Sequence, residues 1–194
     1  MITHVDGILE EKNPAYTVVD VNGIGYLLNI SLNTFSALPD KGRVRLFTHL
    51  SIREDAHVLF GFHSQEEREM FRHLISVSGV GPSTARIVLS GMNAGECASA
   101  IVNEDVATFK SVKGIGAKTA ERIIVDLKNK VDADLVVGEK LFSSNNTIKN
   151  EALSALVVLG VDKKRADKII SKAMADNGDD LTVEDLVKLT LKSL

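Results

Sequence analysis

The chain has 194 residues, of which 44% are hydrophobic and 25% charged, and its formal net charge is −3. These values are normal for a globular protein with one large domain or two to three small ones. The single cysteine, Cys97, excludes an intramolecular disulfide and a cysteine-rich zinc site. Because we find neither an apolar signal stretch nor an 18-residue apolar run, we expect a cytoplasmic protein with no membrane partner.

Residues 1–63 are predicted to form a small β-barrel of the OB type. Residues 15–30 alternate between polar and apolar side chains, and Asn22-Gly23 is a turn signal between two strands. Two further strands are expected over 44–52 and 57–62. The polar connection between them, residues 53–56, predicts a hairpin tip. About five short strands in this length favour a closed barrel.

Residues 64–130 are predicted to be all helical, with four or five short helices. Ser64 is expected to be an N-cap, with Glu67 as its capping-box partner. Residues 103–105 interrupt the helical pattern. Near the end, Ile123, Ile124 and Leu127 share one helix face between residues 120 and 130.

A ten-residue segment of this helical region occurs twice. Ser76–Ala85 returns 35 residues later as Ser111–Ala120, with six of ten positions identical. Each copy has an apolar segment, a Gly-apolar-Gly turn and a helix start, which is a helix-hairpin-helix pattern. Glycine permits a positive φ, and the unpaired N–H groups of a helix start favour an anion. The duplication therefore predicts two phosphate-binding turns that can grip both strands of a DNA duplex.

Two nucleotide-binding alternatives fail on individual residues. A phosphate-binding loop of the ATPase type needs a glycine directly before Lys-Ser/Thr and a second glycine five residues before the first. This chain has Ala117 at the first of these positions and Val112 at the second. A dinucleotide fingerprint needs a third glycine where Thr84 and Thr119 stand. We therefore expect no ATP or NAD site, and no cofactor of the chain's own.

The candidate DNA-binding residues lie in and just after the two turns. They are Gly79, Val80, Gly81, Ser83, Thr84, Gly114, Ile115, Gly116, Lys118, Thr119 and Arg122. Residues 64–130 carry 9 Lys and Arg against 8 Asp and Glu, whereas the regions on either side are acidic. Lys113, Lys118 and Arg122 cluster at the second turn, which fits local capture of phosphate better than a broad basic surface.

The C-terminal third is expected to be a small module on a tether. Residues 131–146 show no sustained periodicity and are predicted to be a flexible linker. Residues 147–194 are predicted to form a three-helix bundle, with Gly160 as a stop signal and Thr182 and Asp185 as a capping pair. Such a tethered bundle is typical of an interaction module; the alternative is a passive tail.

With these elements in place, the chain resembles the RuvA family, whose members bind Holliday junctions in bacterial branch migration. The resemblance covers nearly the whole sequence. Its motifs are Gly23-x-Gly25-Tyr26, residues 53–56 followed by Leu59-Phe60-Gly61-Phe62, Gly79-Val80-Gly81-Pro82, Leu89-Ser90-Gly91-Met92, residues 114–122, and residues 155–160. The implied fold is α+β and multi-domain: an OB-like barrel, a tandem helix-hairpin-helix domain and a C-terminal UBA-like bundle.

The resemblance implies a non-catalytic subunit in homologous recombination and DNA repair. A homotetramer, formed through the barrels, would hold a four-way DNA junction open and square, with one or two tetramers per junction. Contacts to phosphates would read the shape of the DNA rather than its sequence. The implied protein partners are a hexameric RuvB-type ATPase motor, which uses the ATP and binds the C-terminal bundle, and a RuvC-type junction resolvase.

The resemblance also gives roles to two further sets of residues. Glu54 and Asp55 at the hairpin tip would form an acidic pin that repels phosphate and guides strands at the junction centre. Alternatives from the residues alone are a solvated turn, or a metal-dependent nuclease site for which further ligands are missing. The residues implied in binding the motor are Leu156, Leu159, Val161 and Leu191.

Two positions depart from the family pattern. Ser83 and Ala117 stand where members often carry basic residues. Both changes remove a cation near phosphate, so we expect a lower affinity and a shallower salt dependence. The backbone N–H donors are unaffected.

Two other functions remain open on the residues. One is an enzyme, a DNA glycosylase or structure-specific nuclease, for which Asp126 is a weak candidate; the scarcity of aromatic residues argues against a pocket for a flipped base. The other is a general adaptor for duplex DNA with no preference for junctions. We assign no catalytic residue and no metal site.

Overall fold

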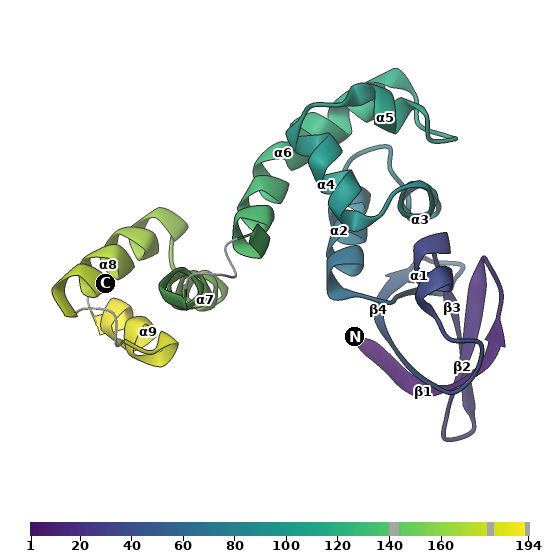
Figure 1. Ribbon diagram of the computed structural model, residues 1–194, viewed down its shortest axis with the longest axis horizontal. Helices are drawn as coiled ribbons and strands as arrows, with labels where there is room; N and C mark the ends of the chain where they lie inside the picture. The colour runs from purple at the N-terminus through teal and green to yellow at the C-terminus, as the bar shows by residue number, and fades with distance from the viewer. Residues whose placement is uncertain (140–143, 178–180, 193–194) are drawn as a thin grey trace. The chain divides into compact units, whose positions relative to one another are not determined.

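The computed structural model describes residues 1–139, 144–177 and 181–192. The chain divides into two compact units, Met1–Asp132 and Ala133–Leu194. The first unit combines the barrel with the tandem hairpins, and the second contains the C-terminal bundle. Figure 1 shows the elements of both units along the chain.

The first unit begins with a closed barrel of five strands in the order β1-β2-β3-β5-β4, which confirms the predicted architecture. The strands are β1 (His4–Lys12), β2 (Tyr16–Val21), β3 (Ile24–Asn29), β4 (Arg43–Ile52) and β5 (His57–Phe62). Neighbours pair antiparallel, except that β3 and β5 meet in parallel at Asn29 and Phe60. Alternating side chains such as Val19, Leu28 and Leu46 point inward and fill the barrel core.

Local sequence explains the turns of the barrel. Asn22 (φ 53°) and Gly23 (φ 88°) both adopt positive φ between β2 and β3, as a two-residue type I′ hairpin requires. A short helix that the sequence analysis missed, α1 (Leu32–Ala37), follows β3. Ser31 caps it by accepting a hydrogen bond from the Thr34 N–H at 3.0 Å.

Five helices begin between residues 64 and 130, which confirms the predicted number, although the last of them is longer than expected. They are α2 (Gln65–Ile75), α3 (Pro82–Gly91), α4 (Ala94–Val102), α5 (Val106–Lys110) and α6 (Ala117–Glu139). The predicted apolar face of α6 is buried, with Ile123 and Leu127 fully inaccessible and Ile124 at 5%.

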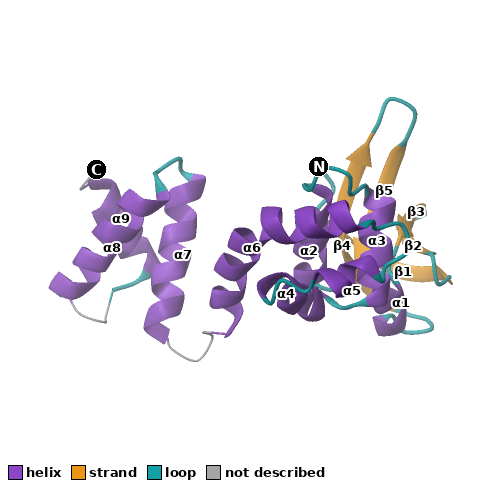
Figure 2. Cartoon of the chain, turned by 90° about the horizontal axis from the view of Figure 1, so that it is seen from above, coloured by secondary structure: helices purple, strands orange, loops and turns teal. Residues whose placement is uncertain are grey.

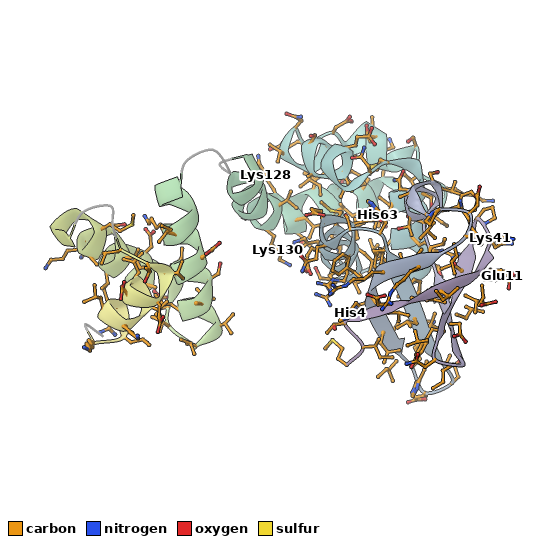
Figure 3. The ribbon with its side chains drawn as sticks, turned by 60° about the horizontal axis from the view of Figure 1, so that its bottom comes forward. His4, Glu11, Lys41, His63, Lys128 and Lys130 are labelled. Carbon is orange, nitrogen blue, oxygen red and sulfur yellow. The ribbon has the colours of Figure 1, made fainter. Side chains whose placement is uncertain are left out.

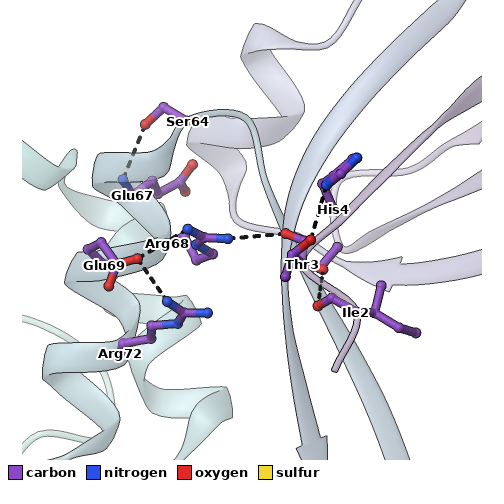
Figure 4. A network of polar contacts seen from close by, with 9 residues as sticks. Ile2, Thr3, His4, Ser64, Glu67, Arg68, Glu69 and Arg72 are labelled. Carbon is purple, nitrogen blue, oxygen red and sulfur yellow. Dashed lines mark hydrogen bonds and ion pairs between the residues drawn. The ribbon is translucent and has the colours of Figure 1, made fainter. Parts of the chain in front are cut away.

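Helix α2 attaches the helical part to the barrel through aromatic packing. The ring of Phe71 on α2 lies 4.9 Å from that of Phe62, 5.1 Å from Phe60 and 5.4 Å from His49, all measured between centroids. Arg68 adds a polar contact, donating from Nη1 to the Thr3 carbonyl at 3.1 Å (Figure 4). Such tilted rings contribute beyond their buried area, so barrel and helices pack as one body.

Of the predicted capping box at α2, the N-cap is confirmed and the partner is not. Ser64 is the N-cap and accepts from the Glu67 N–H at 3.2 Å. The Glu67 side chain, however, is buried and accepts hydrogen bonds from the hydroxyls of Ser31 and Thr34, the latter at 2.6 Å. Hydroxyl donors from the barrel side therefore replace the local backbone partner that the sequence pattern predicted.

The described part of the second unit contains the end of α6 and a three-helix bundle, as predicted. Its helices are α7 (Ser144–Val158), α8 (Lys163–Asn177) and α9 (Val183–Lys192), around a core of Ala152, Leu156, Ala166, Ile170 and Leu186. Gly160 (φ 89°) follows α7, and Thr182 accepts from the Asp185 N–H at 3.2 Å, so both boundary signals are confirmed.

The prediction of a flexible linker over residues 131–146 is corrected at both ends, where the structure has helix. Helix α6 continues to Glu139 and α7 begins at Ser144, while residues 140–143 lie outside the described part of the chain. Residues 131–137 are mostly Val, Ala, Leu and Asp, which a preceding helix can propagate through once nucleation has occurred. Among the described residues, no helix is long and apolar enough to cross a membrane.

Candidate nucleic-acid interface

The first hairpin joins α2 to α3 through a turn centred on Gly79. Gly79 has φ 93°, and Val80 N–H donates to the Val77 carbonyl at 3.0 Å. Val77 and Val80 are buried, whereas Gly79 and Gly81 are exposed. The apolar side chains therefore pull the turn inward and leave the glycine backbone at the surface.

The second hairpin repeats this geometry between α5 and α6. Gly114 has φ 94°, and Ile115 N–H donates to the Val112 carbonyl at 3.1 Å. Val112 and Ile115 are buried and Gly116 is exposed. Even the serine at the end of the preceding helix is repeated, since Ser76 and Ser111 each donate at 2.7 Å to the carbonyl three residues earlier. The sequence repeat is thus a structural repeat.

Both turns leave room for a phosphate against the backbone. A Cβ placed on Gly81, Gly114 or Gly116 would meet nothing within 4 Å. Gly81 is the N-cap of α3 and makes no side-chain capping bond, and Pro82 occupies the first turn. The N–H groups at this helix start are therefore available to an anion, which the helix dipole also attracts.

The structure brings the two hairpins together, which the sequence alone did not predict. Arg122 on α6 donates to the Ser78 carbonyl in the first turn at 3.4 Å, and Lys130 donates to the Ser76 hydroxyl at 3.4 Å. Thr119 Oγ1 lies 3.8 Å from the position of a Cβ on Gly79. The predicted phosphate ligand Arg122 therefore also bridges the hairpins, while Lys118 and Ser83 are exposed and Thr84 and Thr119 are half-buried.

An ion pair fastens α6 to the loop before α5. Lys128 contacts the carboxylate of Glu104, and this hydrogen bond lowers the pKa of Glu104 below its usual range. Glu104 itself adopts a φ of 56°, which is uncommon for a residue other than glycine. Figure 3 labels Lys128 and Lys130 on α6.

The predicted acidic tip is a hairpin end. Arg53 N–H donates to the Ala56 carbonyl at 2.9 Å, which closes the turn between β4 and β5. Glu54 and Asp55 are both exposed in this turn. The loop extends away from the rest of the barrel (Figure 2), so two adjacent carboxylates project from the first unit.

The four residues predicted to bind the motor separate into two groups. Leu156 is fully buried in the core of the bundle and offers no surface there to a partner, and Val161 is half-buried against the same core. Leu159 and Leu191 are 61% and 45% exposed. Val157 and Val158, which were not among the predicted contact residues, are also exposed beside Leu159. The sequence did not indicate which of the two leucines, Leu156 or Leu159, faces the core.

The described residues contain few clusters of side chains that could serve as metal ligands or catalytic groups. No group of three or more His, Cys, Asp or Glu is placed there to hold a metal ion. Asp126, the weak candidate for an enzyme, is exposed on α6. Cys97 is buried, and this burial raises the pKa of its thiol to about 12.

The chain is a DNA-binding protein of the tandem helix-hairpin-helix class. The features that define this class here are the two repeated turns and the free N–H groups at the start of α3, beside the barrel. Three family models match the chain: "RuvA N terminal domain" at residues 1–61, "SAM-like Helix-hairpin-helix tandem" at 71–129, and "RuvA, C-terminal domain" at 147–194. The chain belongs to the RuvA family.

Full-length relatives support this assignment. A protein of Christiangramia forsetii described as "Holliday junction branch migration complex subunit RuvA" is 53% identical over 194 residues, covering all of both chains. Proteins with the same description from Cytophaga hutchinsonii and Flavobacterium psychrophilum are 49% and 48% identical, over 99% and 100% of both chains.

Proposed function

We propose that the chain is a cytoplasmic, non-catalytic subunit that binds four-way DNA junctions and recruits a branch-migration motor. The observation that carries the proposal is the repeated turn, with Gly79 and Gly114 in the same conformation and exposed glycine backbone at each. Each turn binds one phosphodiester backbone, so the pair grips one duplex arm. These contacts select shape because phosphates carry no base identity.

The acidic turn acts where the arms meet. Glu54 and Asp55 repel phosphate, which keeps the exchanging strands apart and directs them into the arms. Repulsion of this kind needs no cofactor. The ATP of branch migration is used by the partner, a hexameric ATPase of the RuvB type, and a RuvC-type resolvase acts on the same junction.

A four-way ligand calls for four copies of the chain. In support of a homotetramer, the first unit exposes large apolar side chains that its own fold does not cover. These are Ile24 at 60%, Leu27 at 54%, Leu32 at 47% and Ile87 at 42%. Contact between subunits through part of this surface removes it from water.

The C-terminal bundle is the docking module for the motor. Val157, Val158 and Leu159 form an exposed apolar run at the end of α7, and Leu191 on α9 is also exposed. Apolar side chains of this kind suit a hydrophobic contact with another protein.

A gel-shift competition tests the proposal. Labelled four-way junction is bound first, excess linear duplex of the same sequence is added, and the mass of the complex is measured. We expect the complex to survive at a mass of four or eight subunits. Equal competition by linear duplex would instead favour a general duplex adaptor, and cleavage of the junction with Mg²⁺ present would favour an enzyme.

A further inference from the structure

Helix α3 carries the phosphate-binding turn at its start, and its other turns are bonded to the barrel. Arg86 donates from Nη1 to the Ala15 carbonyl at 2.8 Å and to Asn29 Oδ1 at 3.1 Å. Ala15 lies between β1 and β2, and Asn29 is the last residue of β3. One guanidinium therefore holds two separate parts of the barrel.

The far end of α3 is held by α1. Asn33 Nδ2 donates to the Leu89 carbonyl at 2.7 Å, which satisfies one of the carbonyls that a helix end leaves unpaired. Ser90 Oγ accepts from the Leu32 N–H at 3.1 Å and donates to the Arg86 carbonyl at 2.8 Å. We call these contacts of Arg86, Asn33 and Ser90 the α3 seam.

The second hairpin is positioned differently. Its helix bonds to the first hairpin through Arg122 and Ser78, and to the loop before α5 through Lys128 and Glu104. The orientation of both turns relative to the barrel therefore depends on how α2 and α3 sit on it. The α3 seam is the polar part of that attachment nearest to the first turn.

We propose that Arg86 and Asn33 are positioning residues for junction selectivity: the α3 seam fixes the phosphate-binding turns relative to the acidic turn. This inference rests on the proposed function. A linear duplex needs the two turns alone, so a small rotation of α3 leaves its binding intact. A junction must also accommodate the repulsive carboxylates of Glu54 and Asp55 at its crossover, so a rotation that brings its phosphates closer to them weakens junction binding.

The test compares junction and linear-duplex affinities of the full-length chain with Arg86→Met, which keeps the apolar stem and removes the donors. We expect junction affinity to fall about tenfold, which is less than the full effect of the two charge-assisted hydrogen bonds that are lost, because only part of their energy is coupled to DNA binding. Duplex affinity should change by less than about twofold. The control is Arg43→Met, which also removes one cation but breaks an ion pair with Asp6 within the barrel. It should leave the ratio of the two affinities unchanged.

A double-mutant cycle separates positioning from general damage. If Arg86 acts through Asn29, the variant with Arg86→Met and Asn29→Ala together should lose no more selectivity than Arg86→Met alone. Asn33→Ala is a milder change and should also lower the ratio of junction affinity to duplex affinity. It serves as the test if the Arg86→Met chain does not fold.

The outcomes distinguish the two proposals. If the unmodified chain binds linear duplex as tightly as a junction, the proposed function fails. If the unmodified chain is selective and the folded variants Arg86→Met and Asn33→Ala keep its full ratio, the positioning role is overturned.

Discussion

Gly79 and Gly114 stand 35 residues apart in the sequence and adopt φ angles of 93° and 94°. The residue after each glycine is buried and donates to the carbonyl three positions earlier. A positive φ costs other residues energy, so the duplication preserves a conformation as well as a sequence. Two equal turns on one unit are what a ligand with two equivalent strands requires.

The two glycines of the second turn should respond differently to alanine. Gly114→Ala places a side chain at positive φ and is expected to lower the free energy of unfolding by about 1 kcal/mol. Gly116, whose φ is not positive, should tolerate alanine without loss of stability, but its new Cβ occupies the open space that a phosphate would enter. Denaturant unfolding and junction affinity, measured on both variants, check this. Unchanged DNA binding by a folded Gly116→Ala chain would show that phosphate does not approach there.

Lys118 should contribute one phosphate contact per subunit. It is exposed beside the second turn, so Lys118→Ala is expected to reduce the salt dependence of DNA binding by about one phosphate contact. The measurement is affinity for a short duplex at several salt concentrations. Lys168→Ala removes an exposed cation from the C-terminal bundle and should not change the slope.

Neutralising the acidic turn should not weaken binding. In Glu54→Gln with Asp55→Asn the repulsion of phosphate is removed, so junction affinity should be equal or higher. The rate of motor-driven branch migration should change, because strands are no longer directed at the crossover. A clear loss of junction binding would refute the repulsive role.

His49 should make the first unit less stable in mild acid. Burial, and then the nearby charges of Arg72 and Arg68, lower the pKa of His49 from its ordinary value of 6.5. Below about pH 6.5 the unfolded chain takes up a proton at His49 that the folded chain resists, so this part of the stability is lost as pH falls toward the folded pKa. The melting temperature should therefore fall from about pH 7.5 to about pH 5.5, and less so in His49→Gln. His57→Gln, at an exposed site, should keep the full decrease.

Truncation should separate DNA binding from motor recruitment. The cut belongs after Asp132 because Val131 is only 2% exposed and Asp132 ends the first compact unit. The shortened chain is expected to bind junctions like the full chain and to lose stimulation of the motor. Pull-down of the ATPase and branch-migration assays give the readouts; recruitment by the shortened chain would exclude the bundle as the docking module.

Local signals in the sequence were enough for much of the fold. Asn22-Gly23 predicted its hairpin, and the Gly-apolar-Gly repeats predicted both turns, because these residues act within a few positions of themselves. Glu67 was misassigned because its pattern is that of a capping box, while its partners Ser31 and Thr34 lie more than 30 residues away. Arg86 gave no signal, since only the folded chain brings it to Ala15 and Asn29. Leu156 lies within α7 and packs into the core, whereas Leu159 follows the end of that helix and is exposed, a difference that their spacing in the sequence did not indicate.

The buried carboxyl of Glu67 has a mechanical consequence. Separating α2 from the barrel would leave this group, and the hydroxyls of Ser31 and Thr34, without their partners in an apolar surrounding. This contact therefore resists movement of the helical hairpins, which carry the predicted phosphate-binding turns, relative to the barrel, which carries the acidic turn. On the proposed function, DNA bound to such a body would be the partner that bends when the crossover opens.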